Sequence, residues 1–162
     1  WASVGDSPLY LLREGRLRRL NETHSLAAHL DVLVAAGEMT AREADAHPAR
    51  HCLTSALGAP NVERIDCPDM ALALRAGDAV VAASDGVMTL GEAAIAAALA
   101  PEVTDGFSSP ASALRSAVLD AATDSQDNIA IAVLQVRAAA AGRAAPGARY
   151  AGHGAMGRVE SA

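Results

Sequence analysis

The first 20 residues contain three short apolar segments separated by turn residues. Trp1–Gly5 and Leu9–Arg13 flank a turn over residues 5–8, and Glu14-Gly15 leads into Arg16–Leu20, where Arg and Leu alternate. Alternation with a period of two is typical of a strand with one face in water, and a Gly-containing pair between two such segments favours a tight hairpin. The pattern therefore predicts a β-meander over residues 1–20.

From residue 25 the apolar residues recur at helical spacing, and Gly37 follows as a C-terminal cap. Thr40 begins a second pattern, because Glu43 stands three residues later and completes a capping box. Pro48 cannot continue a helix and ends this segment. We therefore expect two consecutive helices between residues 25 and 48.

The rest of the chain repeats the change from strand to helix. Residues 52–84 return to strand character, whereas residues 90–99 and 109–122 are rich in Ala and Leu and predict helices. Ile129–Val136 is apolar at successive positions, which predicts a central strand covered on both faces. Residues 138–162 are mainly Ala, Gly, Arg and Pro without periodicity, which is typical of a disordered tail.

This order of elements indicates the fold class. Strands, helices, strands, helices and a final strand follow one another, and short hairpin connections dominate. The pattern favours an α+β fold with antiparallel sheets over a doubly wound parallel sheet. At 162 residues the chain is one domain or most of one. Because it opens directly on a strand-like segment, we expect an N-terminal part of the domain to be missing.

Composition and charge exclude some classes of partner. Apolar residues make up 51% of the chain but aromatic residues only 2%, so the core is expected to consist of Ala, Val, Leu and Ile. A net charge of −6 and few aromatic side chains argue against nucleic-acid binding. No apolar run approaches the about 18 residues that span a bilayer. Cys52 and Cys67 are expected to be buried, reduced thiols of a cytoplasmic protein.

Acidic residues stand at the ends of three predicted strands. Asp6 follows the first strand, Asp85 follows the apolar run 79–83, and Asp127 precedes the last strand. In an antiparallel sheet the end of one strand lies beside the start of its neighbour, so Asp85 and Asp127 could meet. Three carboxylates on a rigid apolar frame suit a hard cation with oxygen ligands. Each acid taken alone is equally typical of an ordinary turn.

The sequence around these acids resembles the type-2C (PPM) family of metal-dependent Ser/Thr protein phosphatases, bacterial type. The resemblance covers residues 1–137 in unbroken order, as the C-terminal portion of that catalytic domain, with residues 21–60 as its flap segment. Its motifs are Val4-Gly5-Asp6-Ser7, Tyr10-Leu11-Leu12-Arg13 with Gly15, His24-Ser25, Gly37-Glu38-Met39-Thr40, His47-Pro48-Ala49-Arg50, Leu53-Thr54-Ser55-Ala56-Leu57-Gly58, Gly77-Asp78, Ser84-Asp85-Gly86 and Asp127-Asn128-Ile129.

The resemblance implies a fold, an activity and a metal centre. The fold would be a β-sandwich of two antiparallel sheets flanked by helices. Asp85 and Asp127 would be ligands of two Mn²⁺ or Mg²⁺ ions, and Asp6 would share a third, weaker site with Asp85, as in some bacterial members. The activity would be hydrolysis of phosphoserine and phosphothreonine on proteins in bacterial signalling, opposing a Ser/Thr kinase in the cytoplasm. The charge, the few aromatic residues and the short apolar runs separately predict no nucleic-acid or membrane partner.

The sequence also departs from the family pattern. Pro8 stands where the family has Arg after G-D-S, Thr23 where it has Asp before the His-Ser pair, and Ala130 where Thr is common. The family's other metal ligands and its phosphate-binding Arg, which belong to the N-terminal half, have no counterpart here. This chain alone is therefore expected to be nearly inactive, and a phosphoprotein-binding pseudophosphatase without turnover is the alternative.

Two further sets of residues have both a functional and an ordinary interpretation. His47 and His51 stand four residues apart and could bind zinc, although Pro48 and the lack of a third ligand argue against it. The cluster Arg13, Arg16, Arg18 and Arg19 is more typical of a solvated hairpin edge than of a phosphate site. A basic edge near the acids could nevertheless attract a phosphopeptide.

Overall fold

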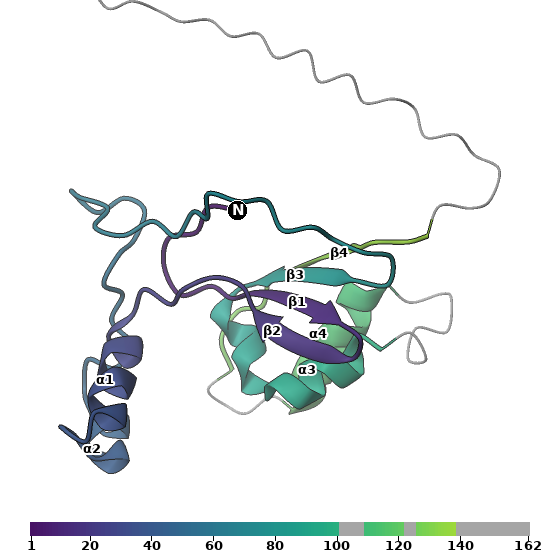
Figure 1. The fold of residues 1–162 in the computed structure, drawn as a ribbon. Coiled ribbons are helices and arrows are strands. Elements are labelled where there is room, and N and C mark those ends of the chain that lie inside the picture. Colours follow the sequence, from purple (N-terminus) through teal and green to yellow (C-terminus); the bar gives the residue numbers. More distant parts are fainter. Residues whose placement is uncertain (101–108, 122–125, 139–162) are drawn as a thin grey trace, which may run out of the picture.

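The computed structural model describes residues 1–100, 109–121 and 126–138. Its centre is a four-stranded antiparallel sheet with the strand order β2-β1-β3-β4 (Figure 1). The strands are β1 (Leu9–Arg13), β2 (Arg16–Arg19), β3 (Ala79–Ala83) and β4 (Ile131–Gln135). The α+β class predicted from the sequence is confirmed.

The β1–β2 hairpin forms as the sequence predicts. Arg13 pairs with Arg16, so Glu14 and Gly15 alone make the turn. Both have positive φ angles, 52° and 73° respectively, which is the backbone geometry of a two-residue hairpin turn that matches the twist of the strands. Gly15 adopts this conformation without the steric cost that a Cβ atom brings.

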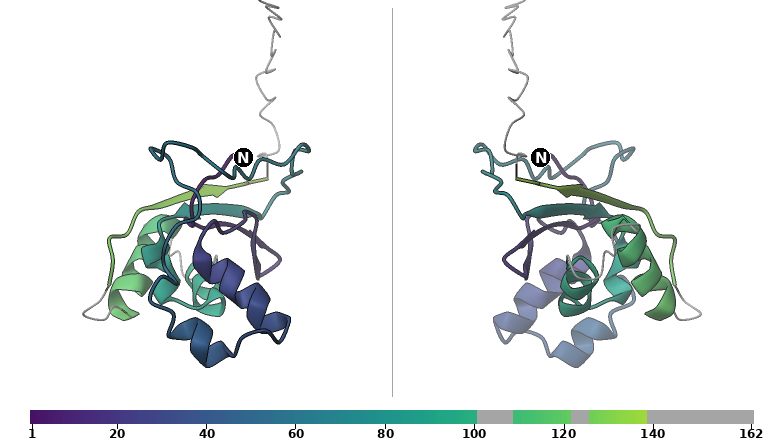
Figure 2. Two further views of the ribbon diagram at one scale, coloured as in Figure 1. Left: turned by 90° about the vertical axis from the view of Figure 1, so that its left-hand side faces the viewer. Right: turned by 90° about the vertical axis from the view of Figure 1, so that its right-hand side faces the viewer.

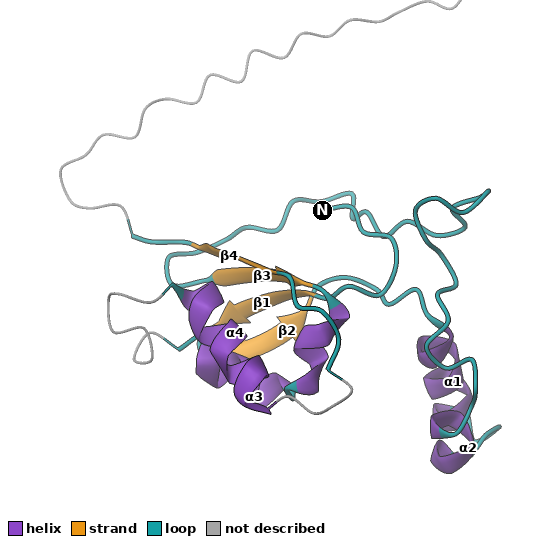
Figure 3. Cartoon of the chain, turned by 180° about the vertical axis from the view of Figure 1, so that it is seen from behind, coloured by secondary structure: helices purple, strands orange, loops and turns teal. Residues whose placement is uncertain are grey.

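The core lies between the sheet and the helices α3 (Glu92–Ala98) and α4 (Pro110–Ala121), which cover one face (Figure 3). Tyr10, Leu12 and Val81 point to this face from the central strands, because alternate residues of a strand share a face. Ile95 and Leu114 meet them from the two helices and are almost fully buried. The core is built chiefly from aliphatic side chains and Ala, as the composition predicts.

The opposite face of the sheet is partly open. Within the part of the chain that the structure describes, β4 is an edge strand, and Leu134 on its outer face is 59% exposed. The prediction that this strand is central and covered on both sides is therefore wrong for these residues. Its apolar sequence indicates burial in general, but it does not identify the neighbouring strands. The described residues form one of the two sheets expected of a sandwich.

The helices α1 (Leu26–Ala35) and α2 (Ala41–Asp45) pack against each other and project away from the sheet (Figures 1 and 2). Both predicted caps are present. Gly37 has a φ of 75°, and the N–H of Glu38 reaches back to the carbonyl of Leu33, which closes α1. The Thr40 side chain accepts a hydrogen bond from the N–H of Glu43, whose carboxylate accepts one from the N–H of Thr40.

Three other expectations are not met. Trp1–Gly5 is not a strand, because only Ser3 pairs, in a single bridge with Asp66. Strand character over residues 52–84 is confined to β3, since the Gly- and Pro-containing segment before it follows an irregular path. Cys52 and Cys67 lie in that segment and are exposed rather than buried. Nearly all of the predicted tail, residues 139–162, lies outside the described residues.

None of the helices that the structure describes has the length and apolar character of a membrane span.

Candidate metal centre

The pairing of β3 with β4 brings two of the predicted acids to neighbouring positions. Ala83 pairs with Ile131, and the ladder continues when the N–H of Ser84 donates to the carbonyl of Ala130 at 2.9 Å. The Ser84 hydroxyl donates to the carbonyl of Asn128 and accepts from the N–H of Ala130, each at 3.0 Å. Asp85 follows the first strand and Asp127 precedes the second, so the predicted neighbourhood of the two segments is confirmed.

The contact between these two segments is backbone against backbone. A Cβ atom at Gly86 would lie 2.6 Å from the carbonyl oxygen of Asn128 and 3.2 Å from that of Asp127. Real Cβ atoms do not approach a carbonyl oxygen so closely, so only glycine permits this packing without displacement. Gly86 therefore sets how near Asp85 and Asp127 can lie.

Gln126 joins the same two segments through its side chain. Its Nε2 donates to the carbonyl of Gly86 at 3.0 Å and to that of Asp127 at 2.9 Å, and its Oε1 accepts from the Thr89 hydroxyl. No pattern in the sequence predicts this role for Gln126. Its bond to Gly86 joins positions 40 residues apart, and no local spacing signals such a contact.

Asp6 reaches the same part of the molecule from the β1 side. Asp6 and Asp85 both line a cavity of about 450 Å³. The backbone at Asp6 is held by His24, which binds both the N–H and the carbonyl of Gly5, at 3.2 Å and 2.9 Å. Asn21 is buried and binds the carbonyl of Ser7 at 2.9 Å. The turn that carries Asp6 is thus fixed by the side chains of Asn21 and His24 and by the backbone N–H of His24.

These acids suit a divalent cation but do not complete its coordination. Among the residues described, Asp6, Asp85 and Asp127 form no ion pair with Arg, Lys or His, so their charges are not neutralised by the protein. Within the same residues, no three His, Cys, Asp or Glu side chains lie close enough to hold a metal ion by themselves. Since hard cations take about six oxygen ligands, the three acids fit a part of such a centre.

The segment over residues 21–60 contributes the other wall of the cavity. Arg50, His51, Thr23 and Ser25 line it, together with Arg19 from the end of β2. Arg50 is already paired with Asp31, at 3.1 Å between Nη2 and Oδ1. The cavity therefore has Asp6 and Asp85 on the sheet side, with arginines, hydroxyls and the paired Asp31 around them.

The described residues do not support a zinc site at His47 and His51. His47 accepts a hydrogen bond at Nδ1 from the N–H of Ala49, at 3.2 Å, while His51 lines the cavity of Asp6 and Asp85. The two do not lie on one helix face, because α2 ends at Asp45.

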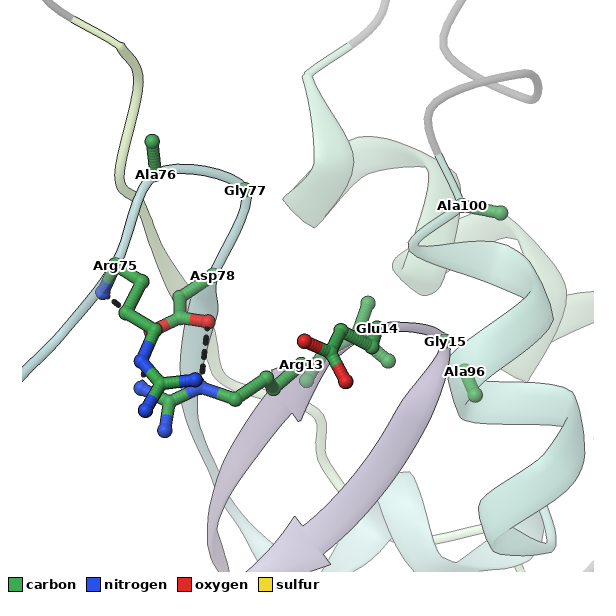
Figure 4. A pocket seen from close by; sticks show the side chains of 10 residues that line it. Arg13, Glu14, Gly15, Arg75, Ala76, Gly77, Asp78, Ala96 and Ala100 are labelled. Atoms are coloured by element: carbon green, nitrogen blue, oxygen red, sulfur yellow. Dashed lines mark hydrogen bonds and ion pairs between the residues drawn. The ribbon is translucent and has the colours of Figure 1, made fainter.

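The Gly77-Asp78 motif serves the fold at the opposite end of the sheet (Figure 4). Asp78 has a side chain 2% exposed and accepts two hydrogen bonds from Arg13, at 2.6 Å and 2.9 Å, and one from the N–H of Arg75. The paired Arg13 guanidinium, helped by this N–H, lowers the pKa of Asp78 to about 2. Asp78 thus anchors the start of β3 to the end of β1.

This anchor predicts a pH-dependent stability. The folded-state pKa of Asp78, about 2, lies below its ordinary value of 3.8, so its contribution is present above pH 4 and is lost as pH falls from about 4 to 2. Asp78→Asn is expected to lower the melting temperature by several degrees at pH 7, with the difference shrinking below pH 4. Exposed Asp69→Asn is the control and should melt like the wild type at each pH. A constant difference between Asp78→Asn and wild type from pH 7 to pH 2 would contradict the assignment.

Comparison with known proteins shows which protein family this chain resembles. No family model matches the chain. A putative protein phosphatase 2C-type from Streptococcus pyogenes is 37% identical over 92 residues, which cover 56% of this chain and 35% of that protein. The solved Ser/Thr phosphatase of S. agalactiae superposes with a TM-score of 0.66 at 31% identity, covering 84% of this chain and 53% of that one. This chain is homologous to the C-terminal region of PPM-type phosphatases.

The homology confirms the resemblance and the fold expected from the sequence. A solved complex of the phosphatase PstP with two manganese ions also superposes, with a TM-score of 0.51 at 28% identity over 82% of this chain and 50% of that one. The present chain spans between about a third and a half of the length of these phosphatases. The sheet in which Asp85 follows β3 and Asp127 precedes β4 is thus similar to that of the solved phosphatases.

Proposed function

We propose that this protein, in its complete form, hydrolyses phosphoserine and phosphothreonine on other proteins with the help of divalent metal ions. The observation that carries the proposal is the position of Asp85 and Asp127, two exposed acids without a cationic partner among the described residues, at adjoining strand ends of a sheet similar to that of PPM phosphatases. Either acid alone would suit an ordinary turn, but two carboxylates at the same sheet edge, neither paired with a cation among the described residues, suit a divalent metal ion.

Each acid has a separate part in this proposal. Asp85 and Asp127 are ligands of two Mn²⁺ or Mg²⁺ ions, and Asp6 shares a third ion with Asp85 in their common cavity. Divalent ions at such a site lower the pKa of water and neutralise charge on phosphoryl oxygens. The chain itself supplies rigidity, because Ser84, Gly86 and Gln126 fix the two strand ends before substrate binds.

The rest of the proposal concerns the whole protein. We infer that residues 1–137 are the C-terminal portion of the phosphatase domain and that residues 21–60 act as a flap beside the site. The remaining ligands would come from a part of the protein beyond these 162 residues, since the solved S. agalactiae phosphatase is about twice as long as the matched region. Its substrates would be cytoplasmic phosphoproteins that a Ser/Thr kinase supplies.

A metal-dependence assay tests this function. The protein expressed from its complete reading frame should release phosphate from a phosphothreonine peptide with Mn²⁺ or Mg²⁺, and EDTA should abolish the release. Excess Mn²⁺ should then restore it. Binding of the peptide without any phosphate release in Mn²⁺ would favour the pseudophosphatase alternative. Release that is insensitive to EDTA would exclude the metal mechanism.

A further inference from the structure

Arg19 occupies an unusual position at the end of β2. It pairs with Tyr10 in the hairpin, is half-buried, and lines the cavity that Asp6 and Asp85 share. Its neighbours in the predicted basic cluster lie elsewhere. Arg16 and Arg18 are exposed, and Arg13 binds Asp78 at the opposite end of the sheet. The structure therefore separates one arginine from the cluster and places it beside the acids.

The Arg19 guanidinium is held in place by neutral groups. Its Nη2 donates to the carbonyl oxygen of Asp6 at 2.7 Å, and its Nε donates to Oδ1 of Asn21 at 3.2 Å. Asn21 is itself fixed, because the same Oδ1 accepts from the N–H of Leu9 and its Nδ2 donates to the carbonyl of Ser7. The position of the guanidinium is thus determined before any ligand binds.

The charge of Arg19 has no counterpart in the described part of the chain. Arg13, Arg50 and Arg64 each form an ion pair with a carboxylate, at 2.6, 3.1 and 3.0 Å respectively. Arg19 forms none with the residues described, although Asp6 and Asp85 line the same cavity. A fixed cation in the same cavity as carboxylates that could bind metal is well suited to an anion that also binds the metal.

We propose that Arg19 contacts the phosphoryl group of the substrate. This inference rests on the proposed phosphatase function and adds a residue for recognition of the phosphate. A guanidinium presents several N–H donors in a planar fork that matches phosphoryl oxygens. The hydrogen bonds to Asp6 and Asn21 use Nη2 and Nε, so Nη1 stays available for the ligand. The ligand class is a phosphate monoester or the inorganic phosphate released from it.

Equilibrium binding of inorganic phosphate tests the proposal without depending on turnover. The protein from the complete reading frame, saturated with Mn²⁺, is titrated with phosphate in a calorimeter, and Mn²⁺ affinity is measured separately. Arg19→Met should weaken phosphate binding about tenfold, as expected for losing a hydrogen bond to a charged group. Arg19→Lys keeps the charge but loses the planar fork of N–H donors. Its phosphate affinity should lie between those of the wild type and Arg19→Met. The inhibition constant of phosphate in the peptide assay should rise in parallel.

Two measurements separate contact with phosphate from other roles. Arg18→Met, one residue earlier on the exposed face of β2, is the matched control and should bind phosphate like the wild type. Mn²⁺ affinity should stay within about twofold of wild type in Arg19→Lys. Unchanged phosphate affinity in both Arg19 variants, or equal losses of phosphate and Mn²⁺ affinity, would overturn the proposal. A wild type that binds phosphate but releases none from the peptide would instead contradict the phosphatase function.

Discussion

Replacing Asp85 by Asn in the protein from the complete reading frame should lower kcat/KM for a phosphothreonine peptide by about 10³-fold or more. Asn has nearly the same shape, so the turn after β3 should persist. The substitution removes the negative charge that would hold the metal ions, and metal ions supply several kcal/mol of transition-state stabilisation. Phosphate release over a range of peptide concentrations at saturating Mn²⁺ measures the effect.

The control for this prediction is an acid of similar exposure away from the site. Asp120 lies near the end of α4 on the surface, and Asp120→Asn should retain full activity. Both variants should melt close to the wild-type temperature. A lower kcat/KM in Asp85→Asn would then reflect the loss of a catalytic group and not unfolding of the protein. An Asp85→Asn protein with kcat/KM within about twofold of wild type would show that this carboxylate is only a turn residue.

Gly86→Ala should impair the same site through the backbone. The added methyl group would lie 2.6 Å from the carbonyl oxygen of Asn128, so the segment that carries Asp127 must move away. We expect kcat/KM to fall about 10- to 100-fold, since small displacements in a site cost that much, and stability to fall by about 1–3 kcal/mol. Peptide hydrolysis and urea denaturation measure the two effects.

Gly91→Ala is the matched control for this substitution. A Cβ atom at Gly91 meets nothing within 4 Å, and its φ of −70° suits any residue. Its activity should therefore stay close to wild type, and because Gly91 is the N-cap of α3, where Gly is preferred to Ala, its stability should fall by no more than about 1 kcal/mol. If Gly86→Ala and Gly91→Ala had equal activity, the close approach of the two strand ends would not matter for function.

The elements predicted correctly from the sequence carry local signals. The hairpin at Glu14-Gly15, the cap at Gly37 and the capping box at Thr40 each involve residues at most a few positions apart. The incorrect predictions concern strands, whose formation depends on partners far away in the sequence. Trp1–Gly5 and the segment before β3 have apolar residues, but within the described part of the chain they share only the single bridge between Ser3 and Asp66.

Prediction of the site from the sequence likewise succeeded where local patterns indicate a contact and failed where only distant residues make it. Asp85 and Asp127 could be placed together because two apolar runs predicted neighbouring antiparallel strands. Gln126 could not, because its bonds to Gly86 and Thr89 cross 40 and 37 residues. Arg19 was one member of an apparently solvated cluster, and only the tertiary structure shows that its guanidinium reaches the carbonyl of Asp6.

The central claim is that Asp85 and Asp127 hold divalent metal ions, and calorimetric titration with Mn²⁺ tests it most directly. In the protein from the complete reading frame, the wild type and Asp120→Asn should bind Mn²⁺ with the same affinity and stoichiometry. Asp85→Asn and Asp127→Asn should each lose at least one bound ion or about tenfold or more in affinity, as expected when a ligand charge is removed. Unaltered Mn²⁺ binding in both variants would contradict the metal centre.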